Sequence, residues 1–179
     1  MMKRFVVPAV LALVLLAPIA QAQRSSQRGS SPIEFGIDGG VTFGLDNPNV
    51  TLVSLPVQAF RVGFLMTPTL EVEPRVNLNS IHGGGASLTT YDIGVGVLYQ
   101  PAGDRVGKGL YGRPFIGVSG FSGSGASDNS GYAGLGVGLK IPFADRRLAT
   151  RMEANYAHGF SGGGSNQIGL LIGLSFFTR

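Results

Sequence analysis

The sequence predicts an all-β fold, an eight-stranded antiparallel up-and-down barrel that spans a membrane. Three observations support this prediction. Apolar residues alternate with polar or glycine residues in eight segments of about 11 residues, the length that a tilted strand needs to cross a bilayer. Every charged residue in these segments falls on the polar parity. The chain also opens with an uncharged apolar segment typical of exported proteins.

The composition excludes several other classes. A chain of 179 residues with 44% apolar residues is too hydrophobic for a disordered protein, and the absence of cysteine excludes a disulfide framework or a cysteine-based metal site. The formal charge is +4, but removal of Lys3 and Arg4 leaves 12 basic against 10 acidic residues, so nucleic acid is not an expected partner. The two histidines, His82 and His158, lie in different predicted elements, so neither a metal site nor a cofactor is expected.

Residues 1–22 are predicted to be a cleaved signal peptide. Two positive charges precede the uncharged run Phe5–Ala22, which is interrupted by two prolines. The run closes on Ala20-Gln21-Ala22, the small-x-small pattern that signal peptidase recognises. Residues 23–32 are then a flexible leader, and residues 33–177 form the barrel.

The barrel segments are assigned from their period of two. They are Ile33–Gly44, Leu52–Phe64, Thr69–Asn79, Thr90–Gln100, Leu110–Gly120, Ala133–Ile141, Leu148–Tyr156 and Gln167–Phe176. In the second segment the apolar parity changes between Val57 and Phe60, which predicts a bulge near Gln58-Ala59. Three prolines within these segments, Pro56, Pro74 and Pro114, are expected at bulges or near the membrane interface because each lacks the N–H that a ladder needs.

The charged residues of these segments are predicted to face the lumen. A soluble barrel would reverse this arrangement, and an Arg or Lys facing lipid at mid-depth costs roughly 2–4 kcal/mol. The bore of eight strands holds only side chains, so nearly balanced charges predict an ion-pair network that plugs it. The predicted network consists of Glu34, Asp38, Arg61, Glu71, Glu73, Arg75, Asp92, Arg113, Lys140, Arg151 and Glu153. Glycines on the same parity are expected to make room for its long side chains, namely Gly94, Gly96, Gly134, Gly136, Gly138, Gly169 and Gly173.

The connections are expected to differ at the two ends of the barrel. Tight turns are predicted after the even strands, with Pro101–Gly109 as a longer exception, and looser outer loops after the odd strands. The predicted outer loops are Leu45–Thr51, Ser80–Ser87, Ser122–Gly131 and Ser161–Asn166. They are rich in Gly, Ser and Asn and contain few aromatic or Arg residues, so recognition through them should be weak or rely on the barrel rim.

The last segment carries a family resemblance. Its alternate apolar residues Ile168, Leu170, Ile172, Leu174 and Phe176 end in an aromatic near the C-terminus. Together with Ala20-Gln21-Ala22, Leu55-Pro56, Arg61-Val62-Gly63-Phe64 and Leu70-Glu71-Val72-Glu73-Pro74, it resembles the small eight-stranded OmpA/OmpX-like outer-membrane barrels. The resemblance covers nearly all of residues 33–177, although Thr178-Arg179 follow the aromatic pair on which the family usually ends. It implies a location in the outer membrane of a Gram-negative-type bacterium, contact with its lipid, and recognition of the last strand by the barrel assembly machinery. Neither a cell-wall anchor nor an oligomer is expected.

The expected function is non-enzymatic, with a structural or surface-interaction role. Two alternatives remain, a small pore and a lipid A-modifying hydrolase. Some barrels of this kind deacylate lipid A with a His-x-Ser pair on the lipid face, and His158, Ser161 and Glu153 lie near one end of the seventh segment. The spacing here is His-x-x-Ser, which places the two side chains on opposite faces of a strand. The sequence therefore predicts no catalytic residues.

Overall fold

The computed structural model describes residues 32–46, 51–83, 86–101, 109–123, 126–143, 147–160 and 165–178, without the side chains of residues 51–58, 81–83 and 86. The predicted signal peptide and nearly all of the predicted leader lie outside these ranges. Among the residues just given, no helix is long and apolar enough to cross a membrane.

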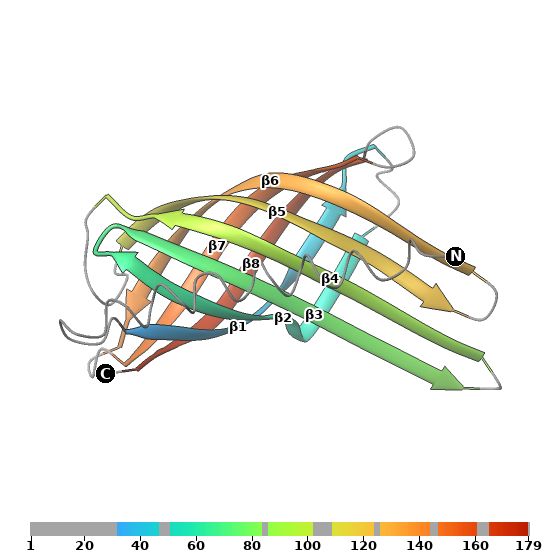
Figure 1. The fold of residues 1–179 in the computed structure, drawn as a ribbon, viewed down its shortest axis with the longest axis horizontal. Coiled ribbons are helices and arrows are strands. Elements are labelled where there is room, and N and C mark those ends of the chain that lie inside the picture. Colours follow the sequence, from blue (N-terminus) through green and yellow to red (C-terminus); the bar gives the residue numbers. More distant parts are fainter. Residues whose placement is uncertain are drawn as a thin grey trace, which may run out of the picture.

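The described chain forms a closed antiparallel barrel of eight strands, which confirms the predicted fold class. Each strand pairs with the next in sequence, and β8 pairs with β1 to close the barrel (Figure 1). The strands are β1 (Ile33–Gly44), β2 (Thr51–Thr67), β3 (Leu70–Gly83), β4 (Ala86–Tyr99), β5 (Gly109–Gly123), β6 (Ala126–Pro142), β7 (Leu148–Gly159) and β8 (Ser165–Phe177).

The two ends of the barrel differ in strand length. We call the end at which β1 begins and β8 ends the terminal end, and the opposite end the distal end. At the distal end β3 to β6 extend as two long hairpins that project beyond their neighbours (Figure 1). Most of Ser80–Ser87 and Ser122–Gly131, predicted as loops, is therefore strand, and two residues separate the paired strands in each hairpin. Ladder pairing overrides the turn preference of Gly and Ser here.

The predicted asymmetry of the connections is correct only in part, since the connections after β1 and β7 are longer than the terminal turn after β2 but those after β3 and β5 are not. Two distal connections contain two residues each, whereas the terminal connection between β4 and β5 spans residues 100–108. Because an up-and-down barrel can extend any hairpin without changing its closure, the two ends differ here in strand length more than in loop length.

The outward face of the barrel is apolar. Leu78, Leu110, Leu135 and Val137 are all at least 64% exposed, and the alternate side chains of β8 share this face. The inward positions hold the charged residues, all buried or half-buried. At the terminal end an apolar layer that includes Leu98 and Phe177 also faces the lumen. A protein with this arrangement is stable only where its outward face meets lipid.

The strand irregularities lie at or beside the prolines. In the β1–β2 ladder, Asp38 pairs with Ala59 but Gly40 pairs with Ser54, so β2 carries extra residues between these pairs. This confirms the predicted bulge near Gln58-Ala59 and places Pro56 inside it.

The other two prolines show a different solution. The β2–β3 ladder is open at Pro74 and the β4–β5 ladder is open at Pro114, yet the register on either side of each opening is unchanged. Neither proline lies in a bulge, so the first of the two predicted placements does not apply to them. A proline lacks one donor, so opening one ladder beside it suffices while the ladder on its other side continues.

Candidate functional site

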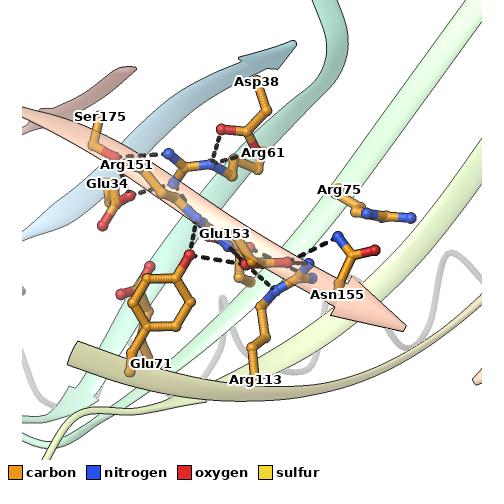
Figure 2. Close-up of polar contacts among 12 residues, drawn as sticks. Glu34, Asp38, Arg61, Glu71, Arg75, Arg113, Arg151, Glu153, Asn155 and Ser175 are labelled. Carbon is orange, nitrogen blue, oxygen red and sulfur yellow. Dashed lines mark hydrogen bonds and ion pairs between the residues drawn. The ribbon is translucent and has the colours of Figure 1, made fainter. Parts of the chain in front are cut away.

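All eleven charged residues singled out in the sequence face the lumen. Nine of them join one buried ion-pair cluster in the terminal half of the barrel, which we call the lumen network. Its members are Glu34, Asp38, Arg61, Glu71, Glu73, Arg113, Lys140, Arg151 and Glu153. Their side chains are at most 6% exposed. Arg75 and Asp92 lie apart and form a separate pair nearer the distal end, and Figure 2 shows Arg75 away from the network.

Arg61 is a centre of the lumen network. Its guanidinium pairs with Glu34, and its Nε lies 3.0 Å from Asp38 Oδ2. Its Nη1 lies 3.1 Å from Glu73 Oε2, and its Nη2 donates to Ser175 Oγ at 2.7 Å. One planar guanidinium thus connects four strands, β1, β2, β3 and β8, because its donors diverge in fixed directions.

Glu73 connects this centre to the opposite wall. It pairs with Arg151 as well as Arg61, and Arg113 Nη1 lies 3.9 Å away. Glu153 accepts from Arg151 at 2.6 Å and pairs with Arg113 through both carboxylate oxygens. These contacts bring β5 and β7 into the same network, as the close-up shows (Figure 2).

Lys140 binds the remaining carboxylates. Its Nζ donates to Glu34 Oε2 and, at 2.8 Å, to Glu71 Oε2. Glu34, Glu71 and Glu73 each place one oxygen within 4.8 Å of the others, a spacing that could hold a metal ion. Here the protein's own cations occupy this acidic group, since Lys140 and Arg61 both contact its members. The lumen network includes residues from six of the eight strands, and Ser175 links it to β8 through its hydrogen bond with Arg61.

The network contains five carboxylates and four cations. Glu71 has the weakest pairing, since Lys140 is shared with Glu34 and no described group hydrogen-bonds to Glu71 Oε1. The predicted near balance of six acids and five bases therefore resolves into a neutral distal pair and a network with one carboxylate in excess. Isolated buried charge is costly, so this carboxylate is where the network should tolerate neutralisation best.

Aromatic residues that the sequence analysis missed complete the network. Tyr111 donates to Glu153 at 2.9 Å and accepts from Arg151 Nε at 2.6 Å. The Arg113 guanidinium lies 4.6 Å from the centre of the Phe115 ring, within the range of a cation–π contact. Both rings share the inward parity of Arg113, so the period of two could have identified them.

The inward glycines make room for these rings as well as for charges. A Cβ at Gly136 would lie 2.7 Å from Glu153, as expected from the sequence. At Gly138 the nearest atoms belong instead to the Tyr111 ring, at 2.2 Å. Gly94, Gly134 and Gly169 likewise face Tyr132, Phe115 and Asn155 respectively. The expectation that all seven glycines accommodate charged side chains is therefore correct only in part.

Above the network, the distal half of the lumen contains a cavity of about 510 Å³. Arg75 and Asp92 line it, 3.2 Å apart, and Arg75 also donates to Tyr132 at 3.0 Å. The rest of the lining is mostly amide and hydroxyl side chains. The lumen is thus divided into a charged, closed terminal half and a polar, hollow distal half.

His158 lies on the outward face at the distal end. Its Nδ1 is 3.0 Å from Asn166 Oδ1, to which Tyr156 also donates. Asn166 in turn donates to Asp46 through both its backbone and its side chain, and these hydrogen bonds lower the pKa of Asp46. Ser161 lies outside the described residues. The observed partner of His158 is thus an amide, which anchors β8 to the segment after β1.

The family model described as outer membrane protein beta-barrel domain matches residues 9–176. The chain belongs to this family. Like the family, it is an integral protein of the bacterial outer membrane, which confirms the location implied by the resemblance. No curated protein sequence matches the chain.

Several solved outer-membrane barrels are similar to the chain. The N-terminal β-barrel domain of Pseudomonas aeruginosa OprF is 15% identical, with a TM-score of 0.48, over 82% of this chain and 98% of that domain. The attachment invasion locus protein Ail of Yersinia pestis is 13% identical, with a TM-score of 0.42, over 82% and 97%. Neisserial surface protein A is 9% identical, with a TM-score of 0.47, over 81% and 95%.

Proposed function

We propose that this outer-membrane barrel is a non-enzymatic structural or surface protein whose lumen is closed by the lumen network. The supporting observation is the network itself, in which contacts among nine charged side chains cross the bore in several directions. A structural role explains why buried charge is present. Several pairs link strands far apart in sequence, and Lys140 and Glu34, for example, are separated by 106 residues.

Closure follows from the size of the bore. Eight strands enclose a space that side chains alone can fill, and here the largest fully buried side chains include Arg61, Arg113, Arg151 and Tyr111. At the terminal end Leu98 and neighbouring apolar residues lie beyond the charges. A solute would have to break several buried ion pairs at once to pass, and each broken pair leaves a charge without a partner.

The cavity in the distal half favours the second candidate, a small pore. It supplies a water-accessible entrance, as a channel requires, but its lining reaches Asp38, which the lumen network binds through Arg61. Vesicles containing the reconstituted protein should therefore not swell in isotonic arabinose faster than protein-free vesicles. Rapid swelling would support the pore instead.

We propose no hydrolase activity. His158 hydrogen-bonds to Asn166, whose amide cannot act as a nucleophile in acyl transfer. Purified wild type is therefore expected to release no acyl chains from lipid A. Release that is lost in both His158→Ala and Ser161→Ala, with each barrel still folded, would overturn this part of the proposal.

We further propose that the distal end faces the exterior and that the protein acts as a monomer in lipid. The apolar stripe of β8, ending at Phe176, would contact lipid after assembly and serve as the recognition signal for the assembly machinery before it. Replacing Phe176 with Ser should reduce the amount of protein in the outer membrane, while Ser175→Ala, beside it but facing the lumen, should not affect targeting. Equal outer-membrane amounts of Phe176→Ser and wild type would contradict this role.

A further inference from the structure

The distal cavity is lined by rows of hydrogen-bonding side chains. Across β3 to β6 the strand register aligns Asn77, Asp92, Ser119 and Ser130 in one row of directly paired positions. All four line the cavity, and the next row toward the distal end begins with Asn79 and Thr90. Adjacent inward rows of this composition present hydrogen-bond donors and acceptors side by side.

The lining of the cavity includes a paired donor and acceptor. Arg75 and Asp92 are 3.2 Å apart, and their side chains remain 19% and 25% exposed. Arg75 Nη2 is bound by Tyr132 and Asp92, and its Nε is buried without a described hydrogen-bond partner, so the exposed part of the guanidinium is what a ligand can reach. A guanidinium donor beside a carboxylate acceptor matches two neighbouring hydroxyl groups, since each hydroxyl both donates and accepts.

The charges around the cavity disfavour an ionic ligand. Arg75 neutralises Asp92, and Arg61 neutralises Asp38, the other carboxylate of the lining. An anion would approach two carboxylates, and a cation would displace a guanidinium that is already paired. Phe121 adds an apolar ring at the mouth, 39% exposed, against which the C–H face of a ring-shaped molecule can pack.

We propose that the distal cavity binds a neutral polyhydroxylated molecule, of the size of a mono- or disaccharide. Its volume of about 510 Å³ falls within the range of about 300–1,000 Å³ typical of small-molecule sites. Arg75 and Asp92 supply the paired donor and acceptor of the site, Asn77 and Ser119 contribute further hydrogen-bonding groups, and Phe121 lies toward the distal end. The site lies on the distal side of the lumen network and requires no passage through it.

The test is a titration of the full barrel in detergent micelles, followed by amide chemical shifts, with glucose, N-acetylglucosamine and maltose as probes. At least one probe should give saturable shifts concentrated around Arg75, Asp92 and Ser119. Glucose 6-phosphate should bind more weakly than glucose. The proposal is overturned if no neutral probe gives saturable shifts below about 50 mM, or if the anionic probe binds more tightly.

Two pairs of variants locate the site. Ser119→Trp should fill the cavity and abolish the shifts, whereas Val118→Trp, next to it on the lipid face, should leave them unchanged. Asn77→Ala should weaken binding up to about tenfold, the loss expected for one hydrogen bond, with Leu78→Ala as its control. Each variant is first shown to be folded by its altered gel migration before boiling. Unchanged binding by both cavity variants would overturn the proposal.

Discussion

Arg61 provides the sharpest test of the lumen network. Replacing it with Met keeps much of its volume but removes the cation that pairs with Glu34, Asp38 and Glu73. Asp38 then loses the only cation with which the described residues pair it, and the excess of carboxylates in the network rises from one to two. Breaking a buried pair by removing one partner costs about 3–5 kcal/mol. We therefore expect Arg61→Met to lower the free energy of unfolding by about 4 kcal/mol.

The matched control is Glu71→Gln. Glu71 is the carboxylate with the weakest pairing, and its neutralisation brings the network to four carboxylates and four cations. Gln keeps an oxygen that can accept from Lys140. The free energy of unfolding should therefore change by less than about 1 kcal/mol. Two substitutions in the same network are thus expected to have very different effects on the free energy of unfolding.

The assay is urea unfolding in lipid vesicles, with the folded fraction read from the gel band that shifts on boiling. With an m value of about 2 kcal/mol per M urea, Arg61→Met should lower the midpoint by about 2 M and Glu71→Gln by less than about 0.5 M. Equal midpoints for Arg61→Met and wild type would refute the view that these ion pairs hold the barrel together. A larger loss of stability for Glu71→Gln than for Arg61→Met would refute the view that the network carries one carboxylate in excess.

Two further predictions concern glycine packing and pH. Gly138→Ala should destabilise the barrel by about 1–3 kcal/mol, since its Cβ would overlap Tyr111, whereas Gly112→Ala meets nothing within 4 Å and should be neutral in the same urea assay. The hydrogen bonds from Asn166 lower the pKa of Asp46 in the folded state below the ordinary value of 3.8. The contact therefore stabilises the folded state fully at pH values above the pKa of Asp46 in the unfolded chain. This stabilisation is lost as the pH falls through the lowered pKa of the folded state. The amide shift of Asn166 should accordingly change only below that value, and a transition near neutral pH would contradict the assignment.

The fold could be predicted because lipid on one side and a narrow bore on the other enforce a strict period of two. Aliphatic residues such as Leu135 and Val137 set the parity of a strand, and the parity then places Lys140 inward without further information. Parity carried the same information for Tyr111 and Phe115. An aromatic ring alone does not indicate an inward position, however, because aromatic residues also form girdles on the lipid face of barrels.

The partners within the lumen could not be predicted in the same way. Which inward side chains meet depends on the stagger between strands, and a one-residue change in any ladder alters every contact across the bore. The pair Lys140–Glu34 and the triple contact of Arg61 depend on this stagger. The distal hairpins were missed because Gly and Ser favour turns in isolation, whereas neighbouring strands can hold them in a ladder.

The most direct test of the closed lumen is single-channel recording of the purified monomer in a planar bilayer. We expect no stable conductance steps in about 1 M salt, because the ion pairs around Arg61 and Glu73 fill the bore. High salt screens exposed charges far more than buried ones, so the result should not change at lower ionic strength. Steady, reproducible openings by the folded wild-type monomer would contradict closure by the lumen network and favour a pore.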